Sequence, residues 1–142
     1  MTAFKDIPIG ELLPQQPPFR FVDALELYSE EVTRVSFTVG DHHLLLDGDH
    51  LAASGLVEHM AQASAARVGY VSKYILHIPV RIGYIGQVKK LVIHRLPRKG
   101  ETLITDVMVR NEVFNITLAD MEVRCGDELI ATATLKSAIK DD

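Results

Sequence analysis

Apolar residues recur at helical spacing in one long stretch of the chain, Ser54 to Tyr70. Within it, Ala61, Ala65 and Gly69 are spaced four residues apart, so three small side chains share one face of a helix. Ser54 suits a helix N-cap, because its hydroxyl can accept a hydrogen bond from a first-turn N–H group. We therefore predict one long helix from Ser54 to Tyr70 that approaches its neighbours closely.

Alternating apolar and polar residues predict extended strands on both sides of this helix. Before the helix, Phe19–Tyr28 and Val32–Val39 are predicted to pair as a hairpin. The segment Gly40–Ala53 follows neither period, and we predict an irregular loop there. The strands predicted after the helix are Ile82–His94, Thr102–Val113, a strand from Phe114 or Asn115 to Arg124, and one from Glu128 to Ser137 or beyond.

One helix and about six antiparallel strands predict an α+β fold, in which the sheet wraps around the helix and buries its apolar face. A chain of 142 residues, 47% of them hydrophobic, can build one core and not comfortably two. We therefore predict a single domain that spans residues 1–142. Because such a wrap leaves sheet edges open, pairing with a second subunit is expected.

Charge and hydropathy argue against several classes of protein. A net charge of −4 argues against a nucleic-acid binder, which relies on clustered positive charge. No apolar run approaches the roughly 20 residues that span a bilayer, and the N-terminus lacks the apolar core of a secretory signal. The single cysteine, Cys125, can form no internal disulfide and is predicted to be a buried strand residue. We expect a cytoplasmic protein with no nucleic-acid or membrane partner.

Several short motifs follow one another along nearly the whole chain. They are Leu12–Asp23 (LLPQQPPFRFVD), Glu58–Gln62 (EHMAQ), Tyr84–Gly86 (YIG), Leu96–Gly100 (LPRKG) and Asp127–Ala131 (DELIA). In order and spacing they resemble the motifs of the hotdog-fold 3-hydroxyacyl-acyl-carrier-protein dehydratases of fatty-acid synthesis. The helix start, Ser54-Gly-Leu-Val-Glu58, resembles more closely the dehydratase-like proteins of aryl-polyene pigment synthesis. The resemblance implies a hotdog fold and an acyl-thioester substrate.

Dehydration of a 3-hydroxyacyl thioester requires a base for the C2 proton, an acid for the departing C3 hydroxyl and donors for the thioester oxygen. A histidine, a carboxyl group and the N–H groups of a helix start supply these, so we predict no metal and no other cofactor. The resemblance implies that Glu58 is the carboxyl group and that Gly55 lies near the oxyanion donors. It also implies substrate contacts from Gln62, Tyr84 and Gly86.

The base has no direct counterpart in this sequence, because the family's glycine-histidine-phenylalanine-proline motif is missing. His43 lies fifteen residues before Glu58, close to the family's spacing. His50 competes with it, just before the helix, and both remain candidates. His59 follows Glu58 directly and so points about 100° further round the helix, which favours a packing role.

These motifs favour a dehydratase-like protein that acts on 3-hydroxyacyl thioesters in fatty-acid or polyene-type lipid synthesis. The resemblance implies acyl carrier protein or coenzyme A as the carrier of the thioester. It also implies that a basic patch receives an acidic carrier protein. The candidate residues for this patch are Lys89, Lys90, Arg95, Arg98 and Lys99.

Two alternatives stay open on the same fold. The missing histidine motif motivates a non-catalytic subunit that binds acyl chains or stabilises a catalytic partner. The assembly is therefore either a homodimer or a mixed dimer with another hotdog subunit. A thioesterase is the second alternative, in which Glu58 would direct water at the thioester carbonyl.

Overall fold

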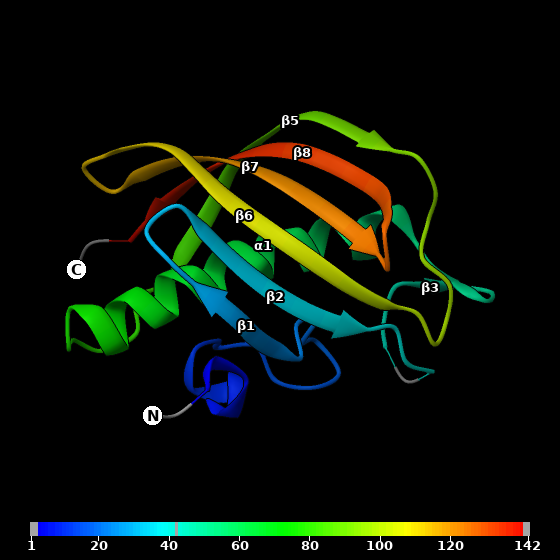
Figure 1. The fold of residues 1–142 in the computed structure, drawn as a ribbon, viewed down its shortest axis with the longest axis horizontal. Helices are drawn as coiled ribbons and strands as arrows, with labels where there is room; N and C mark the ends of the chain where they lie inside the picture. The colour runs from blue at the N-terminus through cyan, green and yellow to red at the C-terminus, as the bar shows by residue number, and fades with distance from the viewer. Residues whose placement is uncertain (1–2, 42, 141–142) are drawn as a thin grey trace.

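The computed structural model describes residues 3–41 and 43–140, which form an antiparallel sheet curved around one long helix (Figure 1). The sheet order is β1-β2-β6-β7-β8-β5, and every neighbouring pair is antiparallel. Its strands are β1 (Ala24–Tyr28), β2 (Val32–Thr38), β5 (Gly83–Ile93), β6 (Thr102–Val113), β7 (Ile116–Cys125) and β8 (Glu128–Ile139). The predicted α+β arrangement of about six strands around one helix is confirmed.

Helix α1 (Ala53–Tyr70) begins one residue before the predicted start. The N-cap residue is Ala52 and not Ser54, so the predicted Ser54 cap is wrong. No side chain forms a capping hydrogen bond at this end of the helix. The first helical hydrogen bond runs from Leu56 N–H to Ala52 O, at 3.0 Å. Beyond Tyr70 the chain continues in a π-helical turn, Val71–Ile75.

The core lies between the concave face of the sheet and α1. Because strand side chains alternate between faces, β6 and β7 bury every second residue over much of their length. Fully buried members include Phe37, Leu103, Met121, Val123 and Leu135 from the sheet, and Leu56, Met60, Ala63 and Ala66 from the helix. Within the described residues, no helix is long and apolar enough to cross a membrane.

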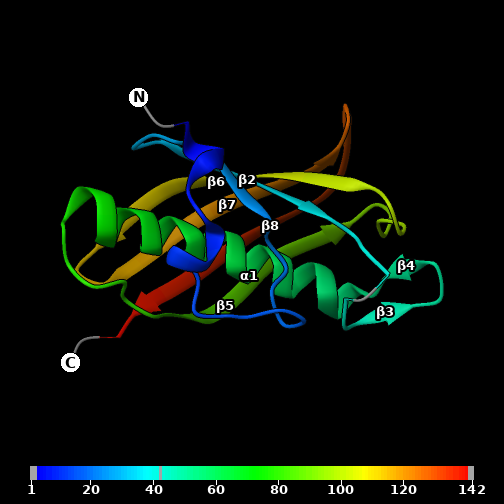
Figure 2. The ribbon, with the colours of Figure 1, turned by 90° about the horizontal axis from the view of Figure 1, so that it is seen from below.

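Two predicted boundaries before the helix are wrong. The strand expected from Phe19 begins only at Ala24, because the backbone of Phe21 bonds to side chains of α1 and not to a neighbouring strand. The loop expected at Gly40–Ala53 contains a small hairpin of β3 (Leu46–Asp47) and β4 (His50–Leu51). This hairpin lies at the N-terminal end of α1 (Figure 2).

The N-terminal segment contains two 3₁₀ turns, Phe4–Asp6 and Ile9–Glu11, and crosses over α1 (Figure 2). The crossing is close because α1 presents Gly69 there. A methyl group on Gly69 would overlap the carbonyl oxygen of Leu12 and would lie 2.9 Å from its carbonyl carbon. The absence of a side-chain carbon at Gly69 therefore allows the N-terminal segment to pack closely on the helix.

Gly69→Ala is expected to lower the free energy of unfolding by about 1–3 kcal/mol, the usual cost of overpacking a well-filled interior. The clash is with backbone, which cannot rotate away, and it outweighs the gain in helix propensity that alanine brings. Urea denaturation measures the change. Gly83→Ala is the matched control, since its new methyl group would meet Ala138 O at an ordinary 3.6 Å. Equal stability of the two variants would contradict the close packing at Gly69.

Cys125 is the last residue of β7, so its predicted place in a strand is confirmed, but it is half-buried where a buried residue was predicted. The position is partly open because the β7–β8 turn follows at once. Burial still raises the pKa of its thiol above the ordinary value. The thiol is therefore held in its protonated, less reactive form.

Candidate functional site

A cavity of about 350 Å³ lies between one face of α1 and the strands β5 and β8. Its lining includes the polar side chains of Gln15, Glu58 and Gln62. The remaining wall is mostly apolar and includes Val57, Ala61, Ala65, Val68, Ile85, Val88 and Leu135. Because alanines occupy the helix side of this wall, the space beside them stays open. The cavity therefore combines a carboxyl group with room for an apolar chain.

Gln62 is the most extensively hydrogen-bonded side chain of this lining. Its side chain is buried, and both its oxygen and its nitrogen form hydrogen bonds. Oε1 accepts from Phe21 N–H at 2.6 Å, while Nε2 donates to Phe19 O at 2.8 Å and to Glu58 Oε1 at 2.9 Å. We call the segment Phe19–Phe21 the strap. One amide thus fixes the strap and orients the Glu58 carboxylate.

His59, which directly follows Glu58 on α1, also anchors the strap. Its Nδ1 lies 2.7 Å from Phe21 O, and its Nε2 lies 2.7 Å from Thr105 Oγ1. Because a carbonyl only accepts, Nδ1 carries the proton and Nε2 accepts from the Thr105 hydroxyl. Complete burial lowers the pKa of His59 to about 4, against the opposing effect of the bond to Phe21. His59 also stacks on Phe37, so its predicted packing role is confirmed.

His43 lies in a different cavity, of about 280 Å³, beside Arg20 and Asp23. Its ring packs against Phe21 and Phe37, with ring centres 5.7 and 4.7 Å away. Its Nδ1 lies 2.9 Å from the backbone N–H of Gly40, which donates to it. In the neutral ring the proton therefore sits on Nε2. Within one chain, His43 and Glu58 line separate cavities.

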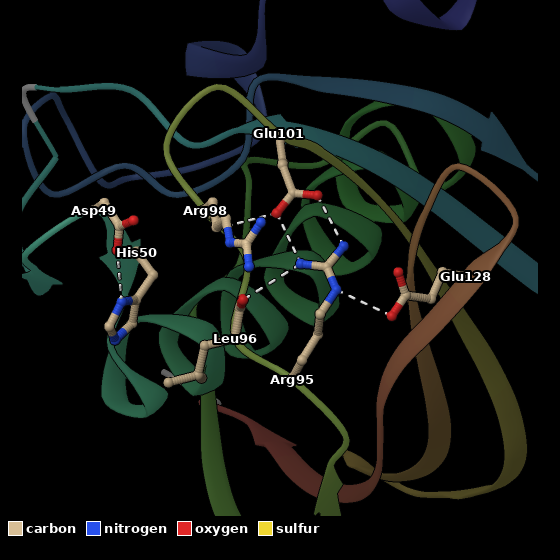
Figure 3. A network of polar contacts seen from close by, with 7 residues as sticks. All are labelled: Asp49, His50, Arg95, Leu96, Arg98, Glu101 and Glu128. Carbon is tan, nitrogen blue, oxygen red and sulfur yellow. Dashed lines mark hydrogen bonds and ion pairs between the residues drawn. The ribbon is translucent and has the colours of Figure 1, made fainter.

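His50 lies on β4, away from the cavity that holds Glu58. Its Nδ1 is 3.2 Å from Asp49 Oδ1 (Figure 3). Its Nε2 is 3.8 Å from Asp47 Oδ2. The loop that follows β5 lies nearby, and its ion pairs centre on Arg95 (Figure 3). His50 thus lies beside two carboxylates of its own hairpin.

Arg95 is the centre of this ionic network (Figure 3). It forms two 2.8 Å bonds to Glu101 and a 3.0 Å bond to Glu128. The Arg95 guanidinium lowers the pKa of Glu101 to about 2. Lys99 Nζ lies 4.0 Å from Asp41. Two members of the predicted basic patch, Arg95 and Lys99, therefore already face carboxylates of this chain.

The remaining predicted site residues lie on two elements. Gly55 is buried in the first turn of α1, where an added methyl group would lie 2.5 Å from Leu51 Cδ1. The N–H groups before Leu56 have no acceptor within the helix, as at any helix start. Tyr84, on β5, lines the cavity and is half exposed, whereas Gly55 and Gly86 lie outside its lining.

The structure therefore brings Glu58, Gln62 and Tyr84 together in the lining of one cavity. It places His43, His50, Gly55 and Gly86 outside that lining. It adds Gln15, which the sequence analysis did not select although it lies inside the Leu12–Asp23 motif. Among the described residues, no group of three histidine, cysteine, aspartate or glutamate side chains is arranged to hold a metal ion.

Comparison with solved structures places this architecture among known folds. A dehydratase heterocomplex, ApeI:P from Xenorhabdus doucetiae, matches with a TM-score of 0.87 and 17% identity, over 96% of this chain and 93% of that one. The PaaI protein of the E. coli phenylacetic acid degradation operon matches with a TM-score of 0.61 and 18% identity, over 80% of each chain. A hypothetical thioesterase with coenzyme A from Streptococcus pneumoniae matches with a TM-score of 0.65 and 12% identity, over 83% of this chain and 85% of that one.

The chain is thus a hotdog-fold protein, as its motifs predict. No curated protein sequence matches it. The family model of the ApeP-like proteins, described as ApeP dehydratase, matches residues 7–142. The protein belongs to this family, which confirms the resemblance to the dehydratase-like proteins of aryl-polyene synthesis.

Proposed function

We propose that this protein supplies the acid and the acyl-chain cavity of a dehydratase that converts 3-hydroxyacyl thioesters into 2-enoyl thioesters and water. One observation carries the proposal: Gln62 holds the Glu58 carboxyl group in the lining of a mainly apolar cavity. An acyl chain gains free energy by leaving water for the apolar wall. Its head group is then placed beside the carboxyl group.

The elimination needs both an acid and a base. A base removes the C2 proton, the electron pair forms the C2–C3 double bond, and the C3–oxygen bond breaks. Protonated Glu58 donates its proton to the departing hydroxyl, which leaves as water. Donors around the thioester oxygen stabilise the negative charge that develops there. In this proposal Gln62 positions Glu58 and takes no proton itself.

The base comes from a second hotdog subunit in this proposal. No histidine among the described residues lines the cavity of Glu58. The cavity is bordered by β5, an outermost strand of the sheet, and Tyr84, Leu91 and Val92 leave apolar surface exposed along it. An open, partly apolar edge strand is a surface for pairing with another sheet. A subunit seated there would face the cavity.

The identity of that subunit separates two forms of the proposal. In a homodimer, His43 or His50 of the second copy supplies the base. In a mixed dimer, the histidine belongs to a different hotdog subunit, and the described dehydratase heterocomplex of similar fold supports this form. Acyl carrier protein as the carrier of the thioester, polyene-type synthesis as its setting and the cytoplasm as its location belong to the same proposal.

A thioesterase is the second candidate, supported by the fold shared with the hypothetical thioesterase from Streptococcus pneumoniae. In that reaction Glu58 directs water at the thioester carbonyl and the carbon–sulfur bond breaks. The products are a free acid and a free thiol. Product analysis therefore separates the two reactions.

The test is to incubate the purified protein with a 3-hydroxyacyl thioester and to follow enoyl absorbance and free thiol together. Enoyl product from the protein alone supports a self-sufficient homodimer. Enoyl product only after addition of a second hotdog subunit supports the mixed dimer. Thiol without enoyl overturns the dehydratase in favour of the thioesterase. If neither product forms, with or without the second subunit, a catalytic role is contradicted. The alternative of a non-catalytic subunit is then favoured.

A further inference from the structure

Two cavities of the structure share part of their lining. Val68 and Ile139 line the cavity of Glu58, and they also line a second cavity of about 250 Å³. No other residue that the structure describes lines both. These two side chains therefore lie between the cavities, and we call them the partition.

The partition is built where the helix meets the end of the sheet. Val68 lies near the C-terminal end of α1 and is only 6% exposed. A methyl group added to Gly83, the first residue of β5, would lie 3.9 Å from Val68 Cγ2, which is ordinary van der Waals contact. Gly83 in turn pairs with Ile139, the last residue of β8. Side chains from α1 and β8 thus close the cavity beside the first residue of β5.

The partition lies at a defined distance from the acid. Val68 follows Glu58 by ten residues, which corresponds to about 15 Å along the helix axis. Contact with the partition itself takes up about 4 Å of this length. An extended chain advances about 1.2 Å per bond, as an extended polypeptide backbone does. The remaining space of about 11 Å therefore holds about nine bonds of a straight chain.

We infer that Val68 and Ile139 determine the length of the acyl chain that the protein accepts, an inference that rests on the proposed function. With its C3 atom beside Glu58, a straight chain of about twelve carbons reaches the partition. A shorter chain leaves part of the apolar wall uncovered and loses the free energy of that burial. A longer chain meets the partition and has to bend or leave its last carbons outside.

The second cavity is the space that a longer chain would enter if the partition were smaller. Its lining includes the apolar side chains of Leu76 and Phe114. It also includes Arg67, whose charge is balanced by Glu112 at 3.2 Å. Removal of the partition would therefore extend the acyl cavity into a partly apolar space.

The inference is tested by calorimetric binding of the amide analogues of octanoyl-, dodecanoyl- and hexadecanoyl-coenzyme A, whose nitrogen in place of the thioester sulfur suppresses hydrolysis. The wild-type protein, in its native assembly, is expected to bind the dodecanoyl analogue at least about tenfold more tightly than the octanoyl analogue, because each buried methylene contributes about threefold. It is expected to bind the hexadecanoyl analogue no more tightly than the dodecanoyl analogue.

Two variants move the limit in opposite directions. Val68→Ala opens the partition and is expected to raise the affinity for the hexadecanoyl analogue at least about tenfold over the wild type. Ala65→Leu fills the cavity about one turn before Val68 and is expected to remove the advantage of the dodecanoyl over the octanoyl analogue. Val57→Ala is the matched control, because it removes the same two methyl groups from the same lining, directly before Glu58. It is expected to keep the wild-type order of the three affinities.

The outcomes separate this inference from the proposed function. If wild-type affinity rises again from dodecanoyl to hexadecanoyl, or if Val68→Ala leaves hexadecanoyl binding unchanged, the partition does not set the chain length and the acyl cavity stands. If Val68→Ala fails to assemble, Ala65→Leu decides, and an unchanged dodecanoyl advantage in that variant overturns the inference. Failure of the wild-type assembly to bind any of the three analogues overturns the proposed function and this inference together.

Discussion

Glu58→Gln is expected to lower kcat for dehydration by about 10²–10⁴-fold, the usual contribution of a positioned proton donor. The variant keeps the size of the side chain and an oxygen that can accept from Gln62 Nε2, whose bond to Glu58 is 2.9 Å. It loses the proton that the departing hydroxyl must receive. The chemical step should therefore fail while the architecture of the site remains.

Enoyl formation with saturating substrate measures this effect, together with urea denaturation of both proteins. The free energy of unfolding is expected to change by less than about 0.5 kcal/mol, because the substitution buries no new group. Glu26→Gln, on β1 and outside the cavity lining, is the matched control and should keep full turnover. Unchanged turnover in Glu58→Gln would exclude Glu58 as the acid. A large loss of stability would instead indicate a structural role.

Mild acid is expected to destabilise the protein through His59. Its pKa is about 4 in the folded chain, below the ordinary value of 6.5 that applies after unfolding. Between these values the unfolded chain binds the proton and the folded chain does not. The free energy of unfolding therefore falls as the pH drops from about 6.5 to 4, by about 3 kcal/mol in total. Above pH 6.5 this contribution is fully present.

Denaturant unfolding at pH 7, 6, 5 and 4 measures this dependence. His59→Gln removes the titrating group, so its stability should be lower at pH 7 and should depend less on pH. His94→Gln, which removes an exposed histidine, should retain the wild-type slope. Parallel pH curves for the wild type and His59→Gln would show that the buried imidazole does not cause the acid sensitivity.

Features with a strong repeat were predictable from the sequence. The helix follows its period of 3.6, and β6 and β7 alternate over many residues, so their existence was clear and only some of their ends moved. The pairing of Glu58 with Gln62 follows from the same period, since residues four apart are neighbours on a helix. These predictions succeeded because each depends on contacts close in sequence.

The features that the sequence did not reveal depend on contacts far apart along the chain. Phe21 alternates as a strand residue does, but Gln62, 41 positions later, takes its N–H group and removes it from the sheet. His43 lies only fifteen positions before Glu58, but it packs against Phe21 in another cavity. Gln15 lines the cavity of Glu58 although it lies 43 positions before it in the chain. Neither spacing nor composition encodes such geometry.

The residue type at position 62 is constrained by two structural roles of the Gln62 amide. The same amide secures the strap, through Phe19 and Phe21, and aims the carboxyl group of Glu58. Neither glutamate nor lysine could replace it, because a carboxylate has no hydrogen to donate and an ammonium group has no lone pair to accept with. A substitution there would loosen the strap and misalign the Glu58 carboxyl group at the same time. Natural variation at this position is therefore expected to be narrower than at Glu58 itself, because a subunit that abandoned catalysis would still need the glutamine to fold.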